Sequence, residues 1–334
     1  GKYTPPTATT TVSGTNPVQV NIPDNGSAGS PITITSGIGR VTKVSLRVTA
    51  DCSLDFGGGL SPGWLFNLTL TLVGPDGTRV PLSIVHRADV PRDGSAPALL
   101  YAYGAYETSM LPWFSIPRLS LLDRGFVWAV AHVRGGGELG RAWYEQGRLL
   151  AKPNTFTDFV ACARHLVDEG WTSADRLVAQ GGSAGGLTVG AAVNLAPDAF
   201  RAVHADVPFV DALTTILNPD LPLTVTEWDE WGDPLHDPAV YACMKGYTPY
   251  ENVPAGRFPA VLATTSLNDT RVEVTEPAKW VAQLRRTVDD DPARPILLRT
   301  EMVAGHGGVS GRYQAWRDLA FELAWIIDQA SSPA

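Results

Sequence analysis

The stretch RLVAQGGSAGGLTVGAAV, residues 176–193, decides the fold class. It opens with a short apolar run, residues 176–179, which is typical of a buried strand, and residues 187–193 form a small-residue segment typical of a helix. Between them stands Ser183, surrounded by four glycines and one alanine. A Gly-x-Ser-x-Gly turn between a strand and a helix is the context of a nucleophile elbow, whose sharp turn exposes the serine hydroxyl. We therefore predict a nucleophilic Ser183 at the carboxyl end of a strand.

Strands and helices alternate along the chain from about residue 79. Apolar, strand-like runs and segments with helical spacing follow one another, with strands expected at 97–104, 126–133, 201–209, 259–267 and 295–303 and helices at 155–170, 277–288 and 312–329. Such alternation predicts an α/β fold, a mostly parallel sheet with helices on both faces. Active sites in sheets of this kind lie at the carboxyl ends of the strands, which is where Ser183 is expected.

Composition narrows the classes of partner. The 334 residues are 44% hydrophobic, with a net charge of -8, which argues against nucleic acid or an anionic membrane surface as partner. No apolar run approaches the length of a bilayer span. The three cysteines are far apart and not in metal-ligand spacing, so we expect no metal and no organic cofactor.

A serine hydroxyl needs a base to take its proton and an acid to orient that base. In α/β folds with a nucleophile elbow these partners follow the serine in the order acid, then histidine. His306 follows the strand-like run 295–303 between glycines, whereas the alternative, His236, lies in a polar turn. Asp269 follows the run 259–267. We therefore predict a catalytic triad of Ser183, Asp269 and His306 from three strand ends.

The first 78 residues differ in composition from the rest. Residues 1–15 are rich in Thr and Pro and are expected to form a flexible arm. Residues 16–78 contain short β-prone runs separated by Gly, Pro, Asn and Asp, which predicts a small antiparallel sheet or sandwich. Residues 79–334 are expected to form the catalytic domain.

Several long stretches resemble a known family. RLSLLDRGFVWAVAHVRGGGELGRAWYE, NTFTDF, QGGSAGG, LPLTVTEWDEWGDP, LNDTRV and AGHGGVSGRY are similar to the catalytic domain of the prolyl oligopeptidase family, and within it to the oligopeptidase B group. The resemblance covers about residues 80–329. It implies an α/β-hydrolase fold and the same three triad residues.

The resemblance also implies further site residues. The elbow itself supplies one oxyanion donor, the backbone N–H of Ala184, and the family's second donor matches Tyr103 in the segment YAYG. Arg271 matches an arginine that holds a substrate carbonyl. Glu227 and Asp229 match the carboxylates of a pocket for Arg or Lys, because a buried cationic side chain needs a carboxylate partner.

The chain departs from the family pattern at several points. Asp229 stands where Glu is usual, and Leu111 and Trp113 stand where bacterial enzymes can carry two aspartates. A preference for two consecutive basic residues is therefore not expected, and that subsite is predicted to be apolar. The family's β-propeller is also not expected, because only about 78 residues precede the similar region. A more open cleft and hydrolysis of small activated esters follow from this.

Residues 21–48 and 68–78 resemble the first part of the P domain of secreted proprotein convertases. This suggests a fused chain with its joint near Gly77. Half of such a sandwich leaves apolar faces and an open edge, so residues 16–78 are expected to pack on the hydrolase domain or on a second copy of the chain, forming a homo-oligomer. One resemblance implies the cytoplasm and the other secretion, so the compartment stays open.

The sequence thus predicts a serine hydrolase that cleaves short peptides, or their esters and amides, after Arg or Lys through an acyl-enzyme on Ser183. One alternative uses the same triad as a carboxylesterase or arylamidase with broad specificity for small substrates. A non-catalytic binding module is a third hypothesis, which the intact serine, aspartate and histidine oppose.

Overall fold

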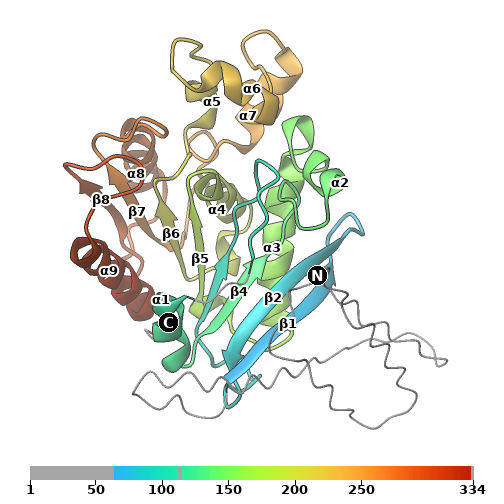
Figure 1. Ribbon diagram of the computed structural model, residues 1–334, viewed down its shortest axis with the longest axis vertical. Helices are drawn as coiled ribbons and strands as arrows, with labels where there is room; N and C mark the ends of the chain where they lie inside the picture. Colours follow the sequence, from blue (N-terminus) through green and yellow to red (C-terminus); the bar gives the residue numbers. More distant parts are fainter. Residues whose placement is uncertain (1–63, 112–114, 332–334) are drawn as a thin grey trace, which may run out of the picture. The chain divides into compact units, whose positions relative to one another are not determined.

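The computed structural model describes residues 64–111 and 115–331. In this part of the chain the strands form one sheet in the order β1-β2-β4-β3-β5-β6-β7-β8 (Figure 1). The strands are β1 (Trp64–Val73), β2 (Arg79–Arg87), β3 (Ala98–Tyr101), β4 (Val127–Ala131), β5 (Leu177–Gly182), β6 (Ala202–Asp206), β7 (Ala260–Ser266) and β8 (Ile296–Glu301). The helices are α1 (Ile116–Asp123), α2 (Arg141–Glu145), α3 (Pro153–Asp168), α4 (Ala184–Leu195), α5 (Ala212–Ile216), α6 (Thr224–Trp231), α7 (Pro238–Tyr247), α8 (Thr275–Thr287) and α9 (Arg312–Ser331).

The sheet is mostly parallel, as predicted. Strands β3 to β8 pair in parallel, whereas β2 runs antiparallel to both β1 and β4. Every strand from β3 to β8 therefore ends at the same edge of the sheet. This is the arrangement of an α/β-hydrolase fold, and the fold-class prediction is confirmed.

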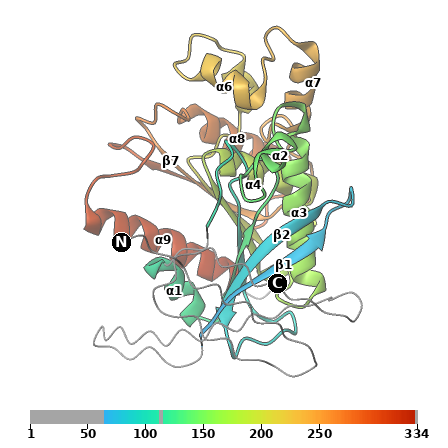
Figure 2. The same cartoon turned by 45° about the vertical axis from the view of Figure 1, so that its right-hand side comes forward.

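Helices cover both faces of the sheet. Helices α3, α4 and α8 bury apolar side chains against one face, and α1 and α9 do so against the other. Figure 2 shows α1 and α9 side by side on their face. The strands between the two layers are buried on both sides, which explains why β4 and β7 consist almost entirely of apolar and small residues.

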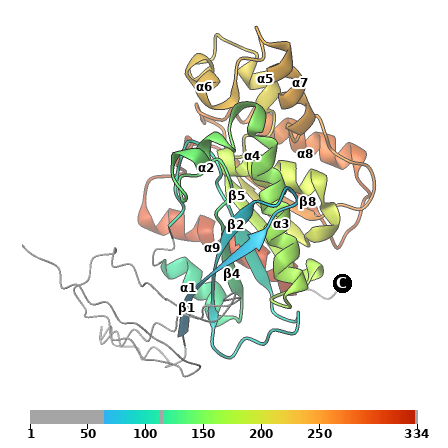
Figure 3. The same ribbon diagram turned by 90° about the vertical axis from the view of Figure 1, so that its right-hand side faces the viewer.

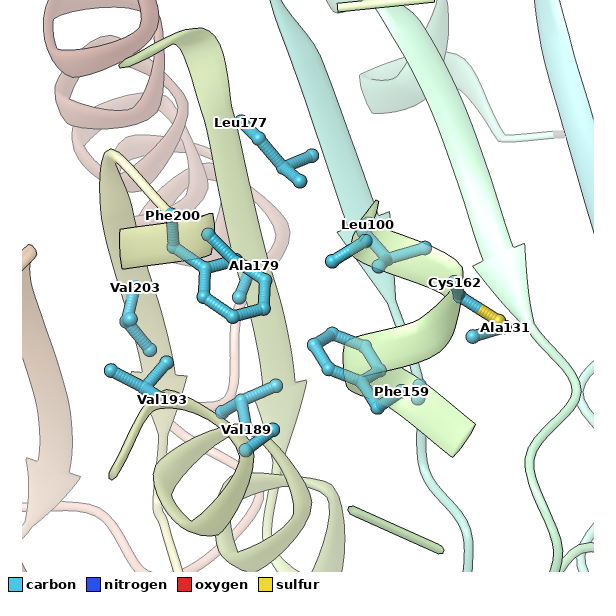
Figure 4. Packing of buried hydrophobic residues seen from close by; sticks show 14 of the residues in the cluster. Leu100, Ala131, Phe159, Cys162, Leu177, Ala179, Val189, Val193, Phe200 and Val203 are labelled. Atoms are coloured by element: carbon cyan, nitrogen blue, oxygen red, sulfur yellow. The ribbon is translucent and has the colours of Figure 1, made fainter. Parts of the chain in front are cut away.

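The core between α3, α4 and the sheet is closely packed (Figure 4). The rings of Phe159 and Phe200 stack with their centroids 5.9 Å apart. Beside them Cys162 is fully buried as a free thiol, and burial raises its pKa well above the usual value. Cys243, also a free thiol, is only half-buried. This packing fixes β5 and α4, the two elements that flank Ser183.

Strand β1 belongs to the hydrolase sheet. Its residues were expected in the β-prone segment 16–78, and a strand there is confirmed. It pairs with β2 as an antiparallel hairpin, so the expected boundary at residue 79 falls between the two strands of that hairpin. The arm 1–15 and residues 16–63 lie outside the described residues, and nothing in the described residues supports a P domain. Oligomerisation through this segment stays a prediction.

Three short helices lie beyond the carboxyl edge of the sheet. Helices α5, α6 and α7 occupy the connection between β6 and β7 and contact one another. Figure 3 shows them together at this end of the fold. The acidic stretch 226–231 lies within α6, and we call this helix the α6 wall. Among the described helices, none combines the length and apolarity needed to cross a membrane.

Candidate active site

Ser183 occupies a sharp turn between β5 and α4. Its φ is 54°, a left-handed conformation that is uncommon for a residue with a side chain. The flanking glycines are required by close backbone contacts: a Cβ on Gly181 would lie 2.2 Å from the Gly185 carbonyl oxygen, and a Cβ on Gly185 would lie 2.7 Å from the Ala102 oxygen. The strand, turn and helix expected around the serine are therefore present.

The backbone of Ser183 is held on both sides. Its N–H donates to the Asp206 carbonyl at 2.8 Å, and its carbonyl accepts from the Phe209 N–H at 3.0 Å. Both partners belong to the end of β6 and the loop that follows it. The side chain of Ser183 is only partly buried, so the hydroxyl lies on a rigid support and remains accessible.

Asp269 and His306 are joined directly. The Nδ1 atom of His306 lies 2.6 Å from Oδ2 of Asp269, whose side chain is fully buried. The other carboxylate oxygen accepts from the backbone N–H groups of Arg271 at 2.8 Å and Val272 at 3.0 Å. The carboxylate is thus fixed by three donors. Since Nδ1 faces the carboxylate, Nε2 is the ring atom left to accept a proton.

Ser183, Asp269 and His306 follow the carboxyl ends of β5, β7 and β8, at the same edge of the sheet. The alternative base, His236, has a different setting. It pairs at 2.7 Å with Asp233, three residues earlier in the same turn, and its side chain is 69% exposed. The geometry therefore favours His306 as the partner of the elbow serine.

The two predicted oxyanion donors lie beside the elbow. Ala184 is the first residue of α4, where backbone N–H groups have no partner within the helix. Tyr103 follows β3, and a Cβ on Gly185 would lie 3.5 Å from its ring. Burial, with smaller effects from Tyr101 and Glu227, raises the pKa of Tyr103 to about 12. Its hydroxyl therefore keeps its proton at neutral pH and can donate.

The two predicted pocket carboxylates differ in their surroundings. Glu227 is half-buried, and its Oε2 accepts from the Trp231 indole at 2.8 Å and from the Tyr106 hydroxyl. Asp229 is exposed, and its backbone carbonyl accepts from Arg148 Nη1 at 2.7 Å, while among the described residues its carboxylate has no hydrogen-bond partner. The structure thus gives Glu227 a fixed position on α6, whereas it leaves the Asp229 carboxylate in solvent.

Of the other predicted site residues, Arg271 and Leu111 have exposed side chains, and Trp113 lies outside the residues that the structure describes. Arg271 has an exposed side chain on the loop that carries Asp269, and its charge acts on Tyr103 to lower that residue's pKa. Leu111 is 59% exposed, and Trp113 lies outside the described residues. In the part of the chain that is described, His, Cys, Asp and Glu side chains do not gather in groups of three or more that could hold a metal ion.

Sequence reasoning missed two buried charges at this site, Lys152 and Glu230. Lys152 immediately precedes α3 and its side chain is 0% exposed, and Glu230 on α6 is almost fully buried. Glu230 stands in the same acidic run as Glu227, so its residue type was visible, but nothing in the sequence distinguishes the carboxylate that turns inward. The sequence gives little indication that Lys152 is buried: it shows only that this lysine stands between an apolar run and the start of a helix.

A second serine–histidine–carboxylate array occurs away from the elbow. Nε2 of His132 lies 2.7 Å from the Ser83 hydroxyl, and Nδ1 lies 3.3 Å from Glu138. Ser83 is 3% exposed and lies within strand β2, so no substrate can reach its hydroxyl. Accessibility, and not hydrogen-bond geometry alone, therefore singles out Ser183.

Comparison with known proteins places this site in a family. Residues 112–332 match the model of the prolyl oligopeptidase family. The chain is 50% identical over 252 residues to dipeptidyl aminopeptidase BI of Pseudoxanthomonas mexicana, and the match covers 75% of this chain and 34% of that protein.

Two solved structures are similar to this chain. Oligopeptidase B from Leishmania major has 43% identity and a TM-score of 0.76, covering 79% of this chain and 36% of its own. Oligopeptidase B from Trypanosoma brucei, solved with covalently bound antipain in a closed form, has 40% identity and a TM-score of 0.79, with 83% and 39% covered.

The match to the family model covers strands β4 to β8 and the loops that carry the elbow, the Asp269–His306 pair and the α6 wall. The chain spans little more than a third of the length of these relatives. The similarity therefore concerns the hydrolase part of longer proteins, and it agrees with the geometry at the strand ends. The chain belongs to the prolyl oligopeptidase family of serine peptidases.

Proposed function

We propose that this chain hydrolyses short peptides after Arg or Lys through an acyl-enzyme on Ser183. The observation that carries the proposal is the 2.6 Å contact between His306 and the buried Asp269, at the same edge of the sheet as a serine on a strained turn. In this proposal Ser183, Asp269 and His306 are the triad, and the Ala184 N–H and the Tyr103 hydroxyl form the oxyanion hole.

The chemistry follows from these roles. Nε2 of His306 takes the Ser183 proton as the hydroxyl oxygen attacks the scissile carbonyl, and the imidazolium that forms is stabilised by Asp269. The negative charge that develops on the carbonyl oxygen is met by the donors of Ala184 and Tyr103. His306 then gives its proton to the leaving amine. Water, activated by the same ring, hydrolyses the acyl-enzyme and restores Ser183.

Substrate choice is assigned to the α6 wall. Oε2 of Glu227 accepts two hydrogen bonds, and these fix the position of the carboxylate. Its other oxygen, Oε1, can then pair with a cationic side chain of the substrate. Because this carboxylate is already fixed in position, it loses little conformational entropy when it binds a guanidinium or ammonium group. Asp229 is expected to contribute less, because its exposed carboxylate is screened by solvent. Arg271 is assigned to a substrate backbone carbonyl.

A substrate panel tests this assignment. Peptide p-nitroanilides with Arg, Lys, Pro or Phe before the cleaved bond are compared for wild type, Glu227→Ala and the matched control Asp229→Ala. Loss of one partner of a partly buried charge pair predicts that Glu227→Ala lowers kcat/KM for Arg and Lys by about 10- to 100-fold, while Phe changes little. Asp229→Ala is expected to change all rates by less than about 3-fold. If Arg and Lys keep their advantage in Glu227→Ala, the pocket assignment is wrong.

The 50% identity to a dipeptidyl aminopeptidase supports a second candidate. The Glu227 carboxylate could instead bind the free α-ammonium of a peptide, so that dipeptides are released from the N-terminus. Blocking the α-amine of an otherwise identical substrate separates the two modes. Cleavage that requires the free amine favours dipeptide release, whereas equal or faster cleavage of the blocked substrate favours the endopeptidase mode.

The same triad could also serve a carboxylesterase or arylamidase. Rates on p-nitrophenyl esters and on Arg p-nitroanilides discriminate this alternative from a peptidase. Ester hydrolysis together with slow, unselective amide hydrolysis would favour the esterase. Labelling by a fluorophosphonate that is lost in Ser183→Ala would exclude a purely binding role for the chain.

A further inference from the structure

A lysine with no access to solvent, Lys152, binds the residue that follows the proposed oxyanion donor Tyr103. Nζ of Lys152 donates to the carbonyl oxygen of Gly104 at 2.5 Å and lies 4.9 Å from the centroid of the Trp231 ring. Its counter-charge is Glu230, whose Oε1 lies 3.9 Å away. Burying an ammonium group is costly even when it is paired, so such a group calls for a physical role.

Glu230 reaches the same loop from the other side. Its Oε1 accepts from the backbone N–H of Tyr106 at 3.1 Å, and its Oε2 accepts from the Tyr144 hydroxyl at 2.6 Å. The two charges therefore hold a carbonyl and an N–H that are two residues apart, at Gly104 and Tyr106. Gly104 directly follows Tyr103 in the chain, and Tyr106 lies two residues further on.

Tyr103 itself is tied to the nucleophile helix. Its carbonyl accepts from the Thr188 hydroxyl on α4 at 2.8 Å. The next residue, Gly104, has a φ of 78°, and a Cβ there would lie 2.6 Å from the Thr155 side chain. The segment 103–106 thus has few alternative conformations as long as Lys152 and Glu230 hold its second half.

From these contacts we propose that the Lys152–Glu230 pair positions the segment 103–106, and through it the Tyr103 hydroxyl, for stabilising the oxyanion. The pair also joins that segment to α6, which carries Glu227, so that oxyanion hole and substrate wall are fixed to one another. Lys152 and Glu230 are positioning residues, since neither touches the substrate. The inference rests on the proposed function, because it assigns a role within the same site.

The titration of Lys152 supplies an independent readout. Burial lowers its pKa to about 8, and Glu230 partly opposes that change. Arg148 also acts on the carboxylate and lowers the pKa of Glu230. Besides burial, Glu230 in turn helps to raise the pKa of four tyrosines, namely Tyr144 on α2 (to about 12), Tyr103, Tyr106 and Tyr247. Tyr144 therefore stays protonated when the ammonium of Lys152 loses its proton above about pH 8, and Glu230 then loses its counter-charge.

The experiment compares wild type, Lys152→Met, Glu230→Gln, the double variant and a control on an exposed lysine, Lys245→Met. The substrate is p-nitrophenyl acetate, which has no basic side chain and does not depend on Glu227. If Lys152→Met displaces the Tyr103 hydroxyl from its position as oxyanion donor, kcat should fall by about 10- to 100-fold, while KM stays within about 3-fold of wild type. The double variant should be less impaired than the product of the single effects, because the two residues act as a pair.

The pH profile separates positioning from mere folding. Wild type should lose kcat above about pH 8, and Lys152→Met should show no such loss. Glu230→Gln should move the loss to lower pH, because the carboxylate that raises the Lys152 pKa is gone. Lys152→Met leaves the buried Glu230 carboxylate without its counter-charge, so its unfolding temperature is expected to fall, whereas the double variant removes both charges and should unfold near the wild-type temperature.

The possible outcomes are distinct. An active wild type with an unchanged kcat in Lys152→Met, or with the same alkaline loss in that variant, overturns the inference and leaves the proposed function intact. If Lys152→Met does not fold, the pH at which Glu230→Gln loses kcat tests the inference instead: a loss at the same pH as in wild type overturns it. A wild type that neither hydrolyses the ester nor reacts with a fluorophosphonate at Ser183 overturns the proposed function itself.

Discussion

At the scale of single residues, the site depends on conformations that neighbouring groups enforce. Ser183 has a left-handed backbone, which costs about 1–2 kcal/mol for a residue with a Cβ. Hydrogen bonds to Asp206 and Phe209 on either side of it hold that conformation. Asp269 shows the same principle, because backbone donors fix one carboxylate oxygen while the other faces His306. Rigid placement of this kind reduces the reorganisation needed during reaction.

The Asp269→Asn variant tests the role of the carboxylate. An amide removes the charge that stabilises the imidazolium and does not enforce the tautomer with Nε2 free, so kcat should fall by about 10³- to 10⁴-fold. Asp233→Asn is a matched control, because Asp233 pairs with His236 at a similar distance on the surface. Its kcat is expected to remain within about 2-fold of wild type. A fall of less than 10-fold in Asp269→Asn would remove Asp269 from the triad.

At the scale of elements, α8 is fastened to the loop that follows β6. Glu276, in the first turn of α8, accepts from the Asp211 N–H at 2.9 Å and from the Thr215 hydroxyl at 2.6 Å. Lys279 on the same helix pairs with the Asp211 carboxylate. Because α8 begins shortly after Asp269, this attachment also supports the loop that carries the proposed acid. Burial raises the pKa of Glu276 to about 8, against the opposing effect of its two hydrogen bonds.

Stability should therefore depend on pH through Glu276. The folded pKa lies above the ordinary value of 4.5, so the folded state binds more protons between these two pH values. The contribution is fully present below about pH 4.5 and is lost as the pH rises towards 8. Urea unfolding midpoints at pH 5, 6.5 and 8 should fall less steeply in Glu276→Gln than in wild type. Glu251→Gln, at an exposed position after α7, should keep the wild-type slope, and a wild-type slope in Glu276→Gln would contradict the prediction.

At the scale of the whole hydrolase fold, one buried arginine connects three distant segments. Arg134, which follows β4, is 2% exposed and bonds Asp158 on α3 through Nη2 at 2.6 Å and Nε at 2.8 Å. Its Nη1 contacts Asp76, in the turn of the β1–β2 hairpin, at 2.6 Å. The hairpin, the sheet and α3 are therefore linked through a single side chain. Removal of one partner would leave an uncompensated buried charge.

Asp158→Ala tests that link. Breaking a buried ion pair from one side typically costs about 3–5 kcal/mol, because the remaining charge keeps its desolvation cost. The free energy of unfolding, measured in urea, should fall by that amount. Asp290→Ala, at an exposed position, should change it by less than about 0.5 kcal/mol. A loss below about 1 kcal/mol in Asp158→Ala would show that this ion pair does not hold α3 to the sheet.

Local sequence patterns determined most of the regular structure. Period-2 and period-3.6 patterns act over a few residues, so the strands around 177–182 and 260–266 and the helices α3, α8 and α9 could be predicted within a few positions. The elbow at Ser183 could be predicted because its Gly-x-Ser-x-Gly pattern is local, although the contact that requires Gly185 comes from Ala102, far away in the chain. The short helices α5 and α7 were not predicted, because five to ten residues carry too little periodicity.

What the sequence by itself determined is the order of the elements and the chemistry offered at each strand end, including Ser183, Asp269 and His306. Only the tertiary structure decided which charges turn inward. Lys152 and Glu230 are 78 residues apart, and their burial depends on the turn just before α3, residues 149–151, meeting helix α6. It also decided that β1 joins the hydrolase sheet. Strand pairing and burial depend on contacts between segments far apart in the chain, which no local pattern specifies.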